Sequence, residues 1–407
     1  MPASRSCAQP DRMAHHRVAA SRVALPVPVV RPRPLLPDGV PERLTDRYGR
    51  TVRDLRLSVT DRCNLRCTYC MPAEGLDWLP GPLLLTTEEI TRLGQLAVER
   101  LGVERIRLTG GEPLMRRDLE AIVGALSGLR TSRGTRPDIA LTTNGLGLHR
   151  RAAALRQAGL DRVNISIDTL DPRGYAELTR RDRLDDVLAG AEAAQAAGLS
   201  PLKVNAVALP GTVEEQAPRL LRECLRRGWQ LRFIEHMPLG PQGSWRADGV
   251  VSAEEVLAAL RGAGFELTEQ GRPGSRPAAL WHVAAGAGHP AGDVGIIASV
   301  TAPFCQDCDR TRVTADGRVM PCLFSSQETD LRGPLRAGAD DDELIRIWAG
   351  AMWLKPRAHG SDTVSPAADG TSSTPDTTEA GTGRRTGTSD RSGGFARPLR
   401  TMSAIGG

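Results

Sequence analysis

Six short strand-like runs alternate with helix-like segments between residues 54 and 236, and this repeat is the strongest constraint on the fold. The runs are rich in apolar residues and bounded by turn residues, whereas the segments between them show the apolar spacing of helices. Such a repeat predicts a parallel sheet with helices outside it, either an open barrel or a doubly wound sheet. The expected strands span residues 54–60, 105–109, 139–143, 162–168, 202–208 and 231–236.

Start and stop signals define several of the helices. The segment Thr86-Thr87-Glu88-Glu89 is a capping box that predicts a helix ending near Gly102. A second capping box, Ser252-Ala253-Glu254-Glu255, predicts another helix beyond the repeat. Residues 185–197 are alanine-rich with one apolar face, and this helix is expected to stop before Gly198.

Three cysteines lie within eight residues directly after the first expected strand: Cys63, Cys67 and Cys70, with the spacing C-x3-C-x2-C. Ligands of α/β folds bind at the C-terminal ends of strands, so this loop is well placed for chemistry. A structural zinc site takes four protein ligands, whereas three thiolates leave one metal position open. The spacing therefore favours a 4Fe–4S cluster with one free iron over a zinc knuckle or three unrelated buried cysteines.

A second group of three cysteines, Cys305, Cys308 and Cys322, follows the spacing C-x2-C-x13-C. Alone, this pattern is more typical of zinc, with His282 or Cys224 as a fourth ligand. Two three-cysteine groups in one chain have a simpler common explanation, which is two 4Fe–4S clusters, each with one open iron. Six of the eight cysteines in two tight groups also indicate metal binding in a reducing, cytoplasmic compartment and not a disulfide framework.

The charge pattern points to a small anionic ligand. The formal net charge is +5, no long basic run stands out, and no apolar run approaches the ~20 residues of a membrane helix. Neither a nucleic acid nor a membrane is therefore expected as a partner. Only two of the 53 basic residues are lysines, Lys203 and Lys355, so a lysine on an expected strand is notable.

Basic residues recur on the expected strands. Arg310 and Arg312 stand two apart on an extended segment and so share one face. Buried cations without carboxylate partners are costly, so a set that points inward would require an anion, and a nucleoside triphosphate would satisfy it. The alternative is that each side chain lies on the outer face of its strand, in solvent. The other members of the set are Arg56, Arg105, Arg107, Lys203 and Arg232.

The first cysteine loop resembles the signature of the radical S-adenosylmethionine enzymes. In that family the open iron binds the amino and carboxylate groups of S-adenosylmethionine, whose cleavage gives a 5′-deoxyadenosyl radical. The segment Gly110-Gly111-Glu112-Pro113 resembles the family's GGEP element, which receives the amino group, and paired glycines let the backbone approach a ligand closely. The resemblance places Tyr69 near the adenine and Ser166 against the cofactor.

The likeness becomes more specific over the whole chain. From about Arg47 to Arg357, and again at the terminal Gly-Gly, the sequence resembles the GTP 3′,8-cyclase family of molybdenum-cofactor biosynthesis. The resemblance implies an incomplete (β/α)6 barrel closed by a C-terminal region that carries the second cluster. It also implies conversion of GTP to (8S)-3′,8-cyclo-7,8-dihydroguanosine 5′-triphosphate. The motifs that carry it are both cysteine groups, GGEP, TTNG at 142–145, KVN at 203–205, RFIEHM at 232–237 and CDRTR at 308–312.

The same resemblance assigns residues to four roles. Those implied for metal binding are Cys63, Cys67, Cys70, Cys305, Cys308 and Cys322. Those implied for S-adenosylmethionine are Tyr69, Gly111, Glu112, Ser166 and Met237. Those implied for GTP are Arg56, Arg107, Thr142, Lys203, Arg232, Arg310, Thr311 and Arg312. Those implied for catalysis are Arg310, Arg312 and the terminal Gly406 and Gly407, which are expected to reach the active site.

The resemblance also suggests an organisation and a set of partners. The implied partners are GTP, an external electron donor of the flavodoxin or ferredoxin type, a second copy in a homodimer, and cyclic pyranopterin monophosphate synthase as the recipient of the product. The expected segments are a disordered extension at 1–46, the barrel core at 47–250, an auxiliary-cluster and substrate region at 251–358, a flexible low-complexity insert at 359–400 and the tail at 401–407.

Two other functions stay open at this point. A peptide-modifying radical enzyme with auxiliary clusters would carry more C-terminal cysteines and fewer inward arginines. A zinc-stabilised nucleic-acid-binding protein would be colourless and would have no use for an open metal position. Analysis of iron and sulfide after anaerobic reconstitution distinguishes these functions.

Overall fold

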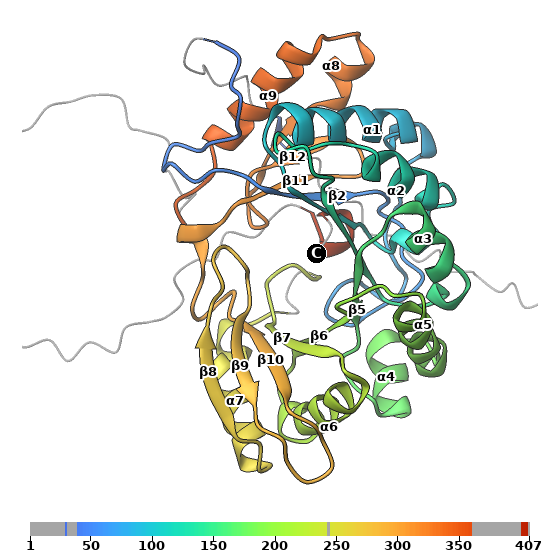
Figure 1. Cartoon of the computed structure of the whole chain (residues 1–407), viewed down its shortest axis with the longest axis vertical. Helices are drawn as coiled ribbons and strands as arrows, with labels where there is room; N and C mark the ends of the chain where they lie inside the picture. The colour runs from blue at the N-terminus through green and yellow to red at the C-terminus, as the bar shows by residue number, and fades with distance from the viewer. Residues whose placement is uncertain (1–28, 31–38, 242–244, 360–399, 406–407) are drawn as a thin grey trace, which may run out of the picture.

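The computed structural model describes residues 29–30, 39–241, 245–359 and 400–405 (Figure 1). Most of the expected N-terminal extension, most of the expected insert and the terminal Gly406-Gly407 lie outside the described residues. Part of the expected extension is ordered, because Leu44 is fully buried and its carbonyl accepts a hydrogen bond from the Val52 amide at 2.8 Å. The ordered chain therefore begins before residue 47.

Six parallel strands form the centre of one open sheet. Their order in the sheet follows their order in the sequence, without the reversal that a doubly wound sheet requires. Every expected strand is present, with ends within two residues of the predicted ones. The strands are β2 Asp54–Ser58, β3 Arg105–Thr109, β4 Asp138–Thr143, β5 Arg162–Ser166, β6 Lys203–Ala208 and β7 Gln230–Glu235.

Helices cover the outer side of these strands (Figure 1). The first expected capping box is present, because the Thr86 hydroxyl accepts from the Glu89 amide and the Glu89 carboxylate accepts from the Thr86 amide. The helices are α1 Thr87–Gln95, which continues as a π-helical turn at Leu96–Arg100, α2 Leu119–Ser127, α3 Ala152–Ala158, α4 Pro172–Thr179, α5 Leu184–Ala196 and α6 Val213–Arg227.

Further strands extend the sheet at both edges. They are β1 Val29–Val30, β8 Leu267–Gly271, β9 Ala279–Val283, β10 Gly292–Ile297, β11 Arg310–Val313, β12 Arg318–Met320 and β13 Gln327–Asp330. On one edge β11 pairs in parallel with β2 and is followed by β12, β13 and β1. On the other edge β10 pairs in parallel with β7 and is followed by β9 and β8. Residues from the C-terminal half thus lie directly beside the first strand of the repeat.

The remaining helices and turns pack around these extensions. Ser252 and Glu255 form the second expected capping box, at the start of α7. Among the described helices, none is both long enough and apolar enough to cross a membrane. The helices are α7 Ala253–Gly262, α8 Arg332–Arg336, α9 Asp341–Trp353 and α10 Met402–Ile405, and short 3-10 turns lie at Gly81–Leu83, Pro113–Met115, Leu148–Arg150, Ala247–Gly249 and Cys305–Asp307.

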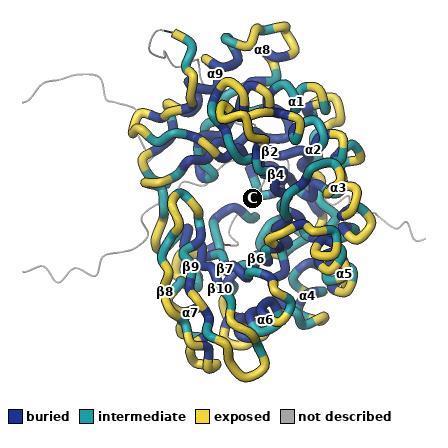
Figure 2. The backbone as a smooth tube through the Cα atoms, in the orientation of Figure 1, coloured by how far each residue is buried: buried dark blue, intermediate teal, exposed yellow. Residues whose placement is uncertain are grey.

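The apolar core lies between the strands and their outer helices, and the strands are its most buried part (Figure 2). On β2, Leu55 and Leu57 join this core, whereas Asp54 and Arg56 alternate with them on the opposite face. Polar side chains therefore collect on the inner face of the sheet. Figure 1 shows α10, drawn red, within the arc of strands on this same side.

Candidate active site

The first cysteine group lies on the loop that follows β2. Cys63, Cys67 and Cys70 are partly exposed free thiols. The backbone amides of Arg66 and Thr68 donate to carbonyls at the end of α4, at 3.0 and 2.9 Å, and hold the loop in place. Burial raises the pKa of Cys63 to about 11 and that of Cys70 to about 12. The thiols therefore stay protonated until a metal takes them as thiolates.

Two glycines after β3 press against this loop. A Cβ atom on Gly110 would lie 2.3 Å from the carbonyl oxygen of Thr60, and one on Gly111 would lie 2.3 Å from that of Arg62. No side chain can be accommodated at such distances without moving the backbone. The sequence suggested that these glycines let the backbone approach a ligand. In the structure, the backbone at both glycines closely approaches the cysteine loop.

A cavity of about 210 Å³ lies between the cysteine loop and the C-terminal ends of the strands. It is bordered by the three thiols and by most of the residues expected to bind S-adenosylmethionine. Thr142, which was expected at GTP, also borders this cavity and accepts a hydrogen bond from the side-chain amide of Asn164 at 3.2 Å. The expected residues found here are Tyr69, Gly111, Ser166 and Met237.

Glu112 is placed differently from the sequence expectation. Its side chain is 1% exposed and is not among the residues that line this cavity. Oε1 accepts from the Thr143 hydroxyl at 2.7 Å and the Leu114 amide at 2.9 Å, and Oε2 accepts from the Asn144 amide at 2.7 Å. Burial raises the pKa of Glu112 to about 7. The carboxylate therefore joins the loops after β3 and β4, and its contact with the amino group of S-adenosylmethionine stays a prediction.

Tyr69 is oriented by a residue that the sequence did not assign to the site. The Tyr69 hydroxyl donates to Oδ2 of Asp168 at 2.8 Å, and Oδ1 of Asp168 accepts from the Val207 amide at 2.8 Å. His236 meets the tyrosine ring edge-on, with ring centroids 6.2 Å apart. The tyrosine is thus fixed at the cavity before any ligand binds. The position of Asp168, two residues beyond Ser166 on the same face, could have indicated this contact.

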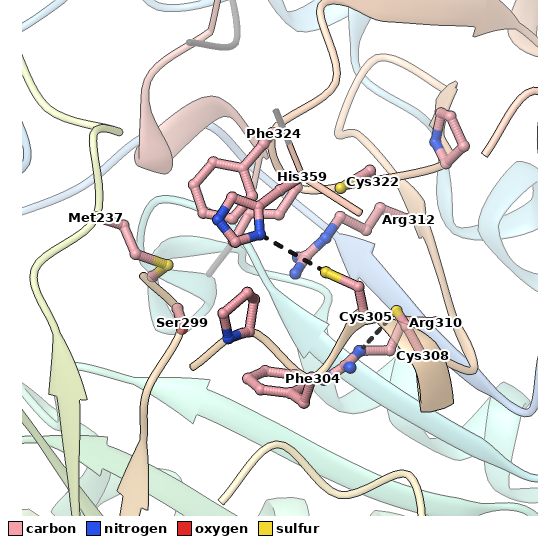
Figure 3. Close-up of a pocket in the computed structure, with 13 residues that line it drawn as sticks. Met237, Ser299, Phe304, Cys305, Cys308, Arg310, Arg312, Cys322, Phe324 and His359 are labelled. Atoms are coloured by element: carbon pink, nitrogen blue, oxygen red, sulfur yellow. Dashed lines mark hydrogen bonds between the residues drawn. The ribbon is translucent and has the colours of Figure 1, made fainter. Parts of the chain in front are cut away.

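The second cysteine group borders a smaller cavity of about 90 Å³ (Figure 3). Cys305, Cys308 and Cys322 line it together with Met237, which also lines the first cavity. The two cysteine groups therefore border adjoining spaces. Nε of Arg310 donates to Sγ of Cys308 at 3.4 Å. Burial alone would raise the pKa of Cys308, but the positive charges of Arg310 and a neighbouring lysine lower this pKa to about 6.

His359 belongs to this second cavity and was missed by the sequence reasoning. Its Nδ1 lies 3.6 Å from Sγ of Cys305, and its ring stacks on Phe324 with centroids 4.8 Å apart (Figure 3). The two residues considered as a fourth zinc ligand lie elsewhere. His282 pairs with an aspartate on the exposed side of β9 and β10, and Cys224 is buried in the apolar core.

Neither cysteine group is arranged for a single ion. Within the part of the chain that the structure describes, no three cysteine, histidine, aspartate or glutamate side chains lie close enough together to bind one metal ion. Each group instead borders an open space, which suits a cluster of several irons better than one tetrahedral zinc.

Three arginines form a row across three strands. Arg312 on β11 lies opposite Arg56 on β2, and Arg56 lies opposite Arg107 on β3. Nε of Arg107 is buried and has no hydrogen-bond partner among the described residues. Burial and the charge of Arg56 hold the pKa of Arg107 well below its usual range, and burial lowers that of Arg312 to about 9. Asp54 is paired with Arg56 at 3.1 Å, and like charges so close together favour a further anion beside the row.

A polar cavity of about 230 Å³ lies beside this row. Seven cationic but only three anionic side chains line it, so the cavity carries an excess of positive charge. Burial lowers the pKa of Lys203 to about 7 and that of Arg232 to about 9. These side chains face inward, and the alternative that each lies outside in solvent is wrong for them. The cationic residues are Arg105, Arg107, Arg162, Lys203, Arg232, Arg276 and Arg310.

Two family profiles together cover most of the chain. Residues 57–224 match the Radical SAM superfamily, and residues 229–361 match Molybdenum Cofactor Synthesis C. A GTP 3′,8-cyclase from Mycolicibacterium smegmatis is 53% identical over 365 residues, which cover 89% of this chain and 92% of the relative. A GTP 3′,8-cyclase from Corynebacterium glutamicum is 52% identical over 366 residues, 89% of each chain. This chain belongs to the GTP 3′,8-cyclase family.

Solved structures share the fold of this GTP 3′,8-cyclase family member at low identity. Streptococcus suis SuiB bound to the precursor peptide SuiA has a TM-score of 0.52 and 15% identity, and the match covers 75% of this chain and 67% of that one. SuiB bound to S-adenosylmethionine has a TM-score of 0.50 and 14% identity, over 74% and 65% of the two chains. At such identities the likeness concerns the fold alone.

Thr311, which was expected to bind GTP, also lies differently from the sequence expectation. It alternates with Arg310 and Arg312 on β11, so it points to the opposite face. Thr311 is fully buried, and its hydroxyl accepts from the indole N–H of Trp348 on α9 at 3.0 Å. Its side chain therefore connects the strand to a helix and does not reach the basic cavity.

Proposed function

We propose that this protein converts GTP to (8S)-3′,8-cyclo-7,8-dihydroguanosine 5′-triphosphate, using S-adenosylmethionine. The observation that carries the proposal is the row Arg312, Arg56 and Arg107, which runs from the second cysteine-lined cavity, bordered by Arg312, to the basic cavity, bordered by Arg107. A triphosphate has the charge density to satisfy buried guanidinium groups. The relatives named GTP 3′,8-cyclase support GTP as the nucleotide.

We infer that the six parallel strands form the incomplete (β/α)6 barrel and that each cysteine group binds a 4Fe–4S cluster. In both groups the thiols border a space instead of converging on one point, which fits a cluster. When bound, the first cluster and S-adenosylmethionine supply a 5′-deoxyadenosyl radical, and the electron comes from an external donor of the flavodoxin or ferredoxin type.

The chain's own residues would bind and orient GTP. Arg310 lines both the basic cavity and the second cysteine-lined cavity, so one molecule can span the two. The triphosphate would lie with Arg107 and Lys203 in the basic cavity, and the guanine would lie near the second cysteine group. Met237 borders both cysteine-lined cavities, so the ribose would lie where they adjoin. Transfer of the C3′ hydrogen to the 5′-deoxyadenosyl radical there would let the C3′ radical add to C8 of the guanine, and the nitrogen-centred radical that this leaves would take up one electron and one proton.

Three further proposals follow from the family. The protein forms a homodimer, and it passes its product to cyclic pyranopterin monophosphate synthase. The terminal Gly406 and Gly407, which lie outside the described residues, enter the active site and assist the reaction of GTP. Deletion of this pair is expected to leave cleavage of S-adenosylmethionine intact and to abolish cyclisation.

The test is anaerobic reconstitution followed by two parallel measurements. About eight irons per chain are expected, because two 4Fe–4S clusters are proposed. With GTP, S-adenosylmethionine and dithionite, we expect 5′-deoxyadenosine and the cyclised nucleotide in similar amounts, and with ATP in place of GTP no cyclised product. Zinc in place of iron would overturn the cluster proposal. Formation of 5′-deoxyadenosine without any cyclised nucleotide would overturn the choice of substrate.

A further inference from the structure

Arg400 is buried between two carboxylates at the edge of the sheet. Its Nε and Nη2 donate to the two oxygens of Glu328 at 2.6 and 2.8 Å. Its Nη1 and Nη2 donate to the two oxygens of Asp316 at 3.1 and 2.9 Å. All three residues are at most 7% exposed. A guanidinium that makes four such bonds holds its backbone firmly, because its planar fork matches two carboxylates.

The two carboxylates belong to a rigid part of the fold. Glu328 lies on β13, and Asp316 lies in the turn between β11 and β12. The turn is fixed by the Thr314 hydroxyl, which donates to Asp316 at 2.6 Å. Arg318 on β12 also approaches both carboxylates, at 3.3 and 3.9 Å. The two carboxylates therefore contact one cation from their own sheet, Arg318, and a second cation, Arg400, from near the C-terminal end of the chain.

The residues directly after Arg400 lie against the first cysteine loop. The Met402 amide donates to the Leu239 carbonyl at 3.0 Å, and the Met402 side chain lines the first cavity. The backbone of Ser403 approaches the Cys70 thiol closely enough to counter part of the rise that burial causes in the pKa of this thiol. Ile405 is fully buried. The short helix α10 thus forms part of the wall of the proposed S-adenosylmethionine site.

A helix of one turn cannot hold this position by itself. Isolated helices shorter than about 12 residues are marginal in water, and α10 has four residues. Its backbone makes a single hydrogen bond to Leu239, from Met402, and approaches Cys70 at Ser403. The strongest attachment of this segment among the described residues is the four-bond contact of Arg400 with Asp316 and Glu328.

We propose that Arg400 is a positioning residue that anchors the C-terminal segment over the first cysteine loop. The anchor keeps the Ser403 backbone beside the Cys70 sulfur and Met402 in the cavity wall. The inference deepens the proposed function and rests on it, because the anchored helix borders the cavity assigned to S-adenosylmethionine. Loss of the anchor releases α10, moves the Ser403 backbone away from a proposed cluster ligand and opens the cavity on that side.

Hydrogen exchange of the full-length, reconstituted protein tests the anchor directly. In Arg400→Met we expect the amides of residues 402–405 to exchange about 10- to 100-fold faster than in the unchanged protein, since charged hydrogen bonds are lost. The matched control is Arg318→Met, which removes the other cation from the same two carboxylates but does not belong to the C-terminal segment. In this control the amides of α10 should exchange within about twofold of their rate in the unchanged protein.

Two further measurements distinguish anchoring from a general loss of folding. Arg400→Lys keeps the charge but has only one nitrogen, so it should give an intermediate exchange rate. The reduction potential of the first cluster, read by its EPR signal without GTP, should fall in Arg400→Met and stay unchanged in Arg318→Met, because the Ser403 backbone moves away from the Cys70 sulfur only in the former.

Two outcomes would overturn the proposal. Unchanged exchange of α10 in Arg400→Met would show that the helix docks without the anchor. If the α10 amides exchanged equally fast in Arg400→Met and Arg318→Met, the two carboxylates would stabilise β11 to β13 and would have no specific role in holding α10. Neither the exchange rate nor the reduction potential depends on GTP. A protein that fails to cyclise GTP would therefore overturn the proposed function, whereas the difference in exchange between Arg400→Met and Arg318→Met would still test the anchor.

Discussion

Arg56 lies directly opposite Arg107 in the parallel register of β2 and β3. Like charges opposite each other destabilise a sheet, and here Arg56 is buried and Arg107 half-buried. Asp54 forms an ion pair with Arg56 at 3.1 Å and its charge also acts on Arg107, so one carboxylate serves two guanidinium groups. The ligand-free protein therefore contains a repulsion between Arg56 and Arg107 that a bound polyanion would remove.

Replacing Arg107 with methionine should weaken GTP binding without destabilising the ligand-free protein. The loss of hydrogen bonds to a charged group is worth about 1.5–3 kcal/mol, so calorimetry should record an affinity about 10- to 100-fold lower. The melting temperature without GTP should not fall, because a like charge opposite Arg56 is removed. Thr311→Val is the control, since this side chain faces α9, and it should bind GTP normally. Unchanged affinity in Arg107→Met would mean that the phosphates bind elsewhere.

Lys203 should take up a proton when GTP binds. Burial, followed by the charge of Arg232, lowers its pKa from 10.5 to about 7. Since the folded pKa lies below the unfolded one, the unfolded chain binds more protons between pH 7 and 10, and stability without ligand rises with pH across this window. The triphosphate favours the charged form and raises the pKa again.

The measurement for Lys203 is calorimetry at pH 8 in buffers of different ionisation enthalpy. We expect proton uptake approaching one per GTP in the unchanged protein and much less in Lys203→Met. Lys203→Arg should bind GTP without this uptake and should lose most cyclisation, because a planar guanidinium does not fit where a compact ammonium does. Full activity of the arginine variant would contradict this account.

Substitutions in the two cysteine groups should have different effects on the two products. Alanine at Cys63, Cys67 or Cys70 should abolish 5′-deoxyadenosine with or without GTP, because the site for S-adenosylmethionine is lost. Serine at Cys305 should abolish the cyclised nucleotide while cleavage of S-adenosylmethionine continues. Chromatographic quantification of both products distinguishes the two groups. A cyclised product from Cys305→Ser at the normal yield would remove the second cluster from the reaction.

His359 should tune the cluster that we propose at the second cysteine group. Its ring nitrogen lies 3.6 Å from the Cys305 sulfur, and a hydrogen bond to a cluster ligand raises the reduction potential. His359→Phe keeps a ring to stack on Phe324 but removes this bond, so the potential should become more negative. The redox titration uses EPR in a background where the first cysteine group is replaced by alanine. His282→Phe, on the exposed side of β9, is the control, and equal potentials in both variants would contradict the role of His359.

The strands were predictable because their signal is local. A buried parallel strand is a short apolar run between turn residues, and each such run appears in the structure near its predicted ends. The cysteine spacing was equally local and identified both groups. The row of arginines was only partly predictable. The alternation of side chains along a strand predicts which face of the sheet Arg312 occupies. Its place beside Arg56 depends instead on the pairing of β11 with β2, more than 250 residues away in the sequence.

The missed features all depend on contacts between distant segments. Glu112 follows β3, but two of its three donors, Thr143 and Asn144, come from the end of β4 and the residue after it. His359 has no sequence pattern that marks it, and it reaches Cys305 only because Arg50 and Lys355 hold the chain around it. Arg400 follows a stretch rich in Ser, Thr, Gly and Arg, so composition gave no reason to distinguish it from its neighbours.

The contact of Gly111 with the Arg62 carbonyl has a consequence for the sequences that this fold tolerates. The residues just before Cys63 pack backbone on backbone against Gly111, and a Cβ atom on this glycine would lie 2.3 Å from the Arg62 carbonyl oxygen. Even alanine at this position would therefore displace the start of the cysteine loop. A residue without a side chain is thus as exacting a requirement here as any group that takes part in the chemistry.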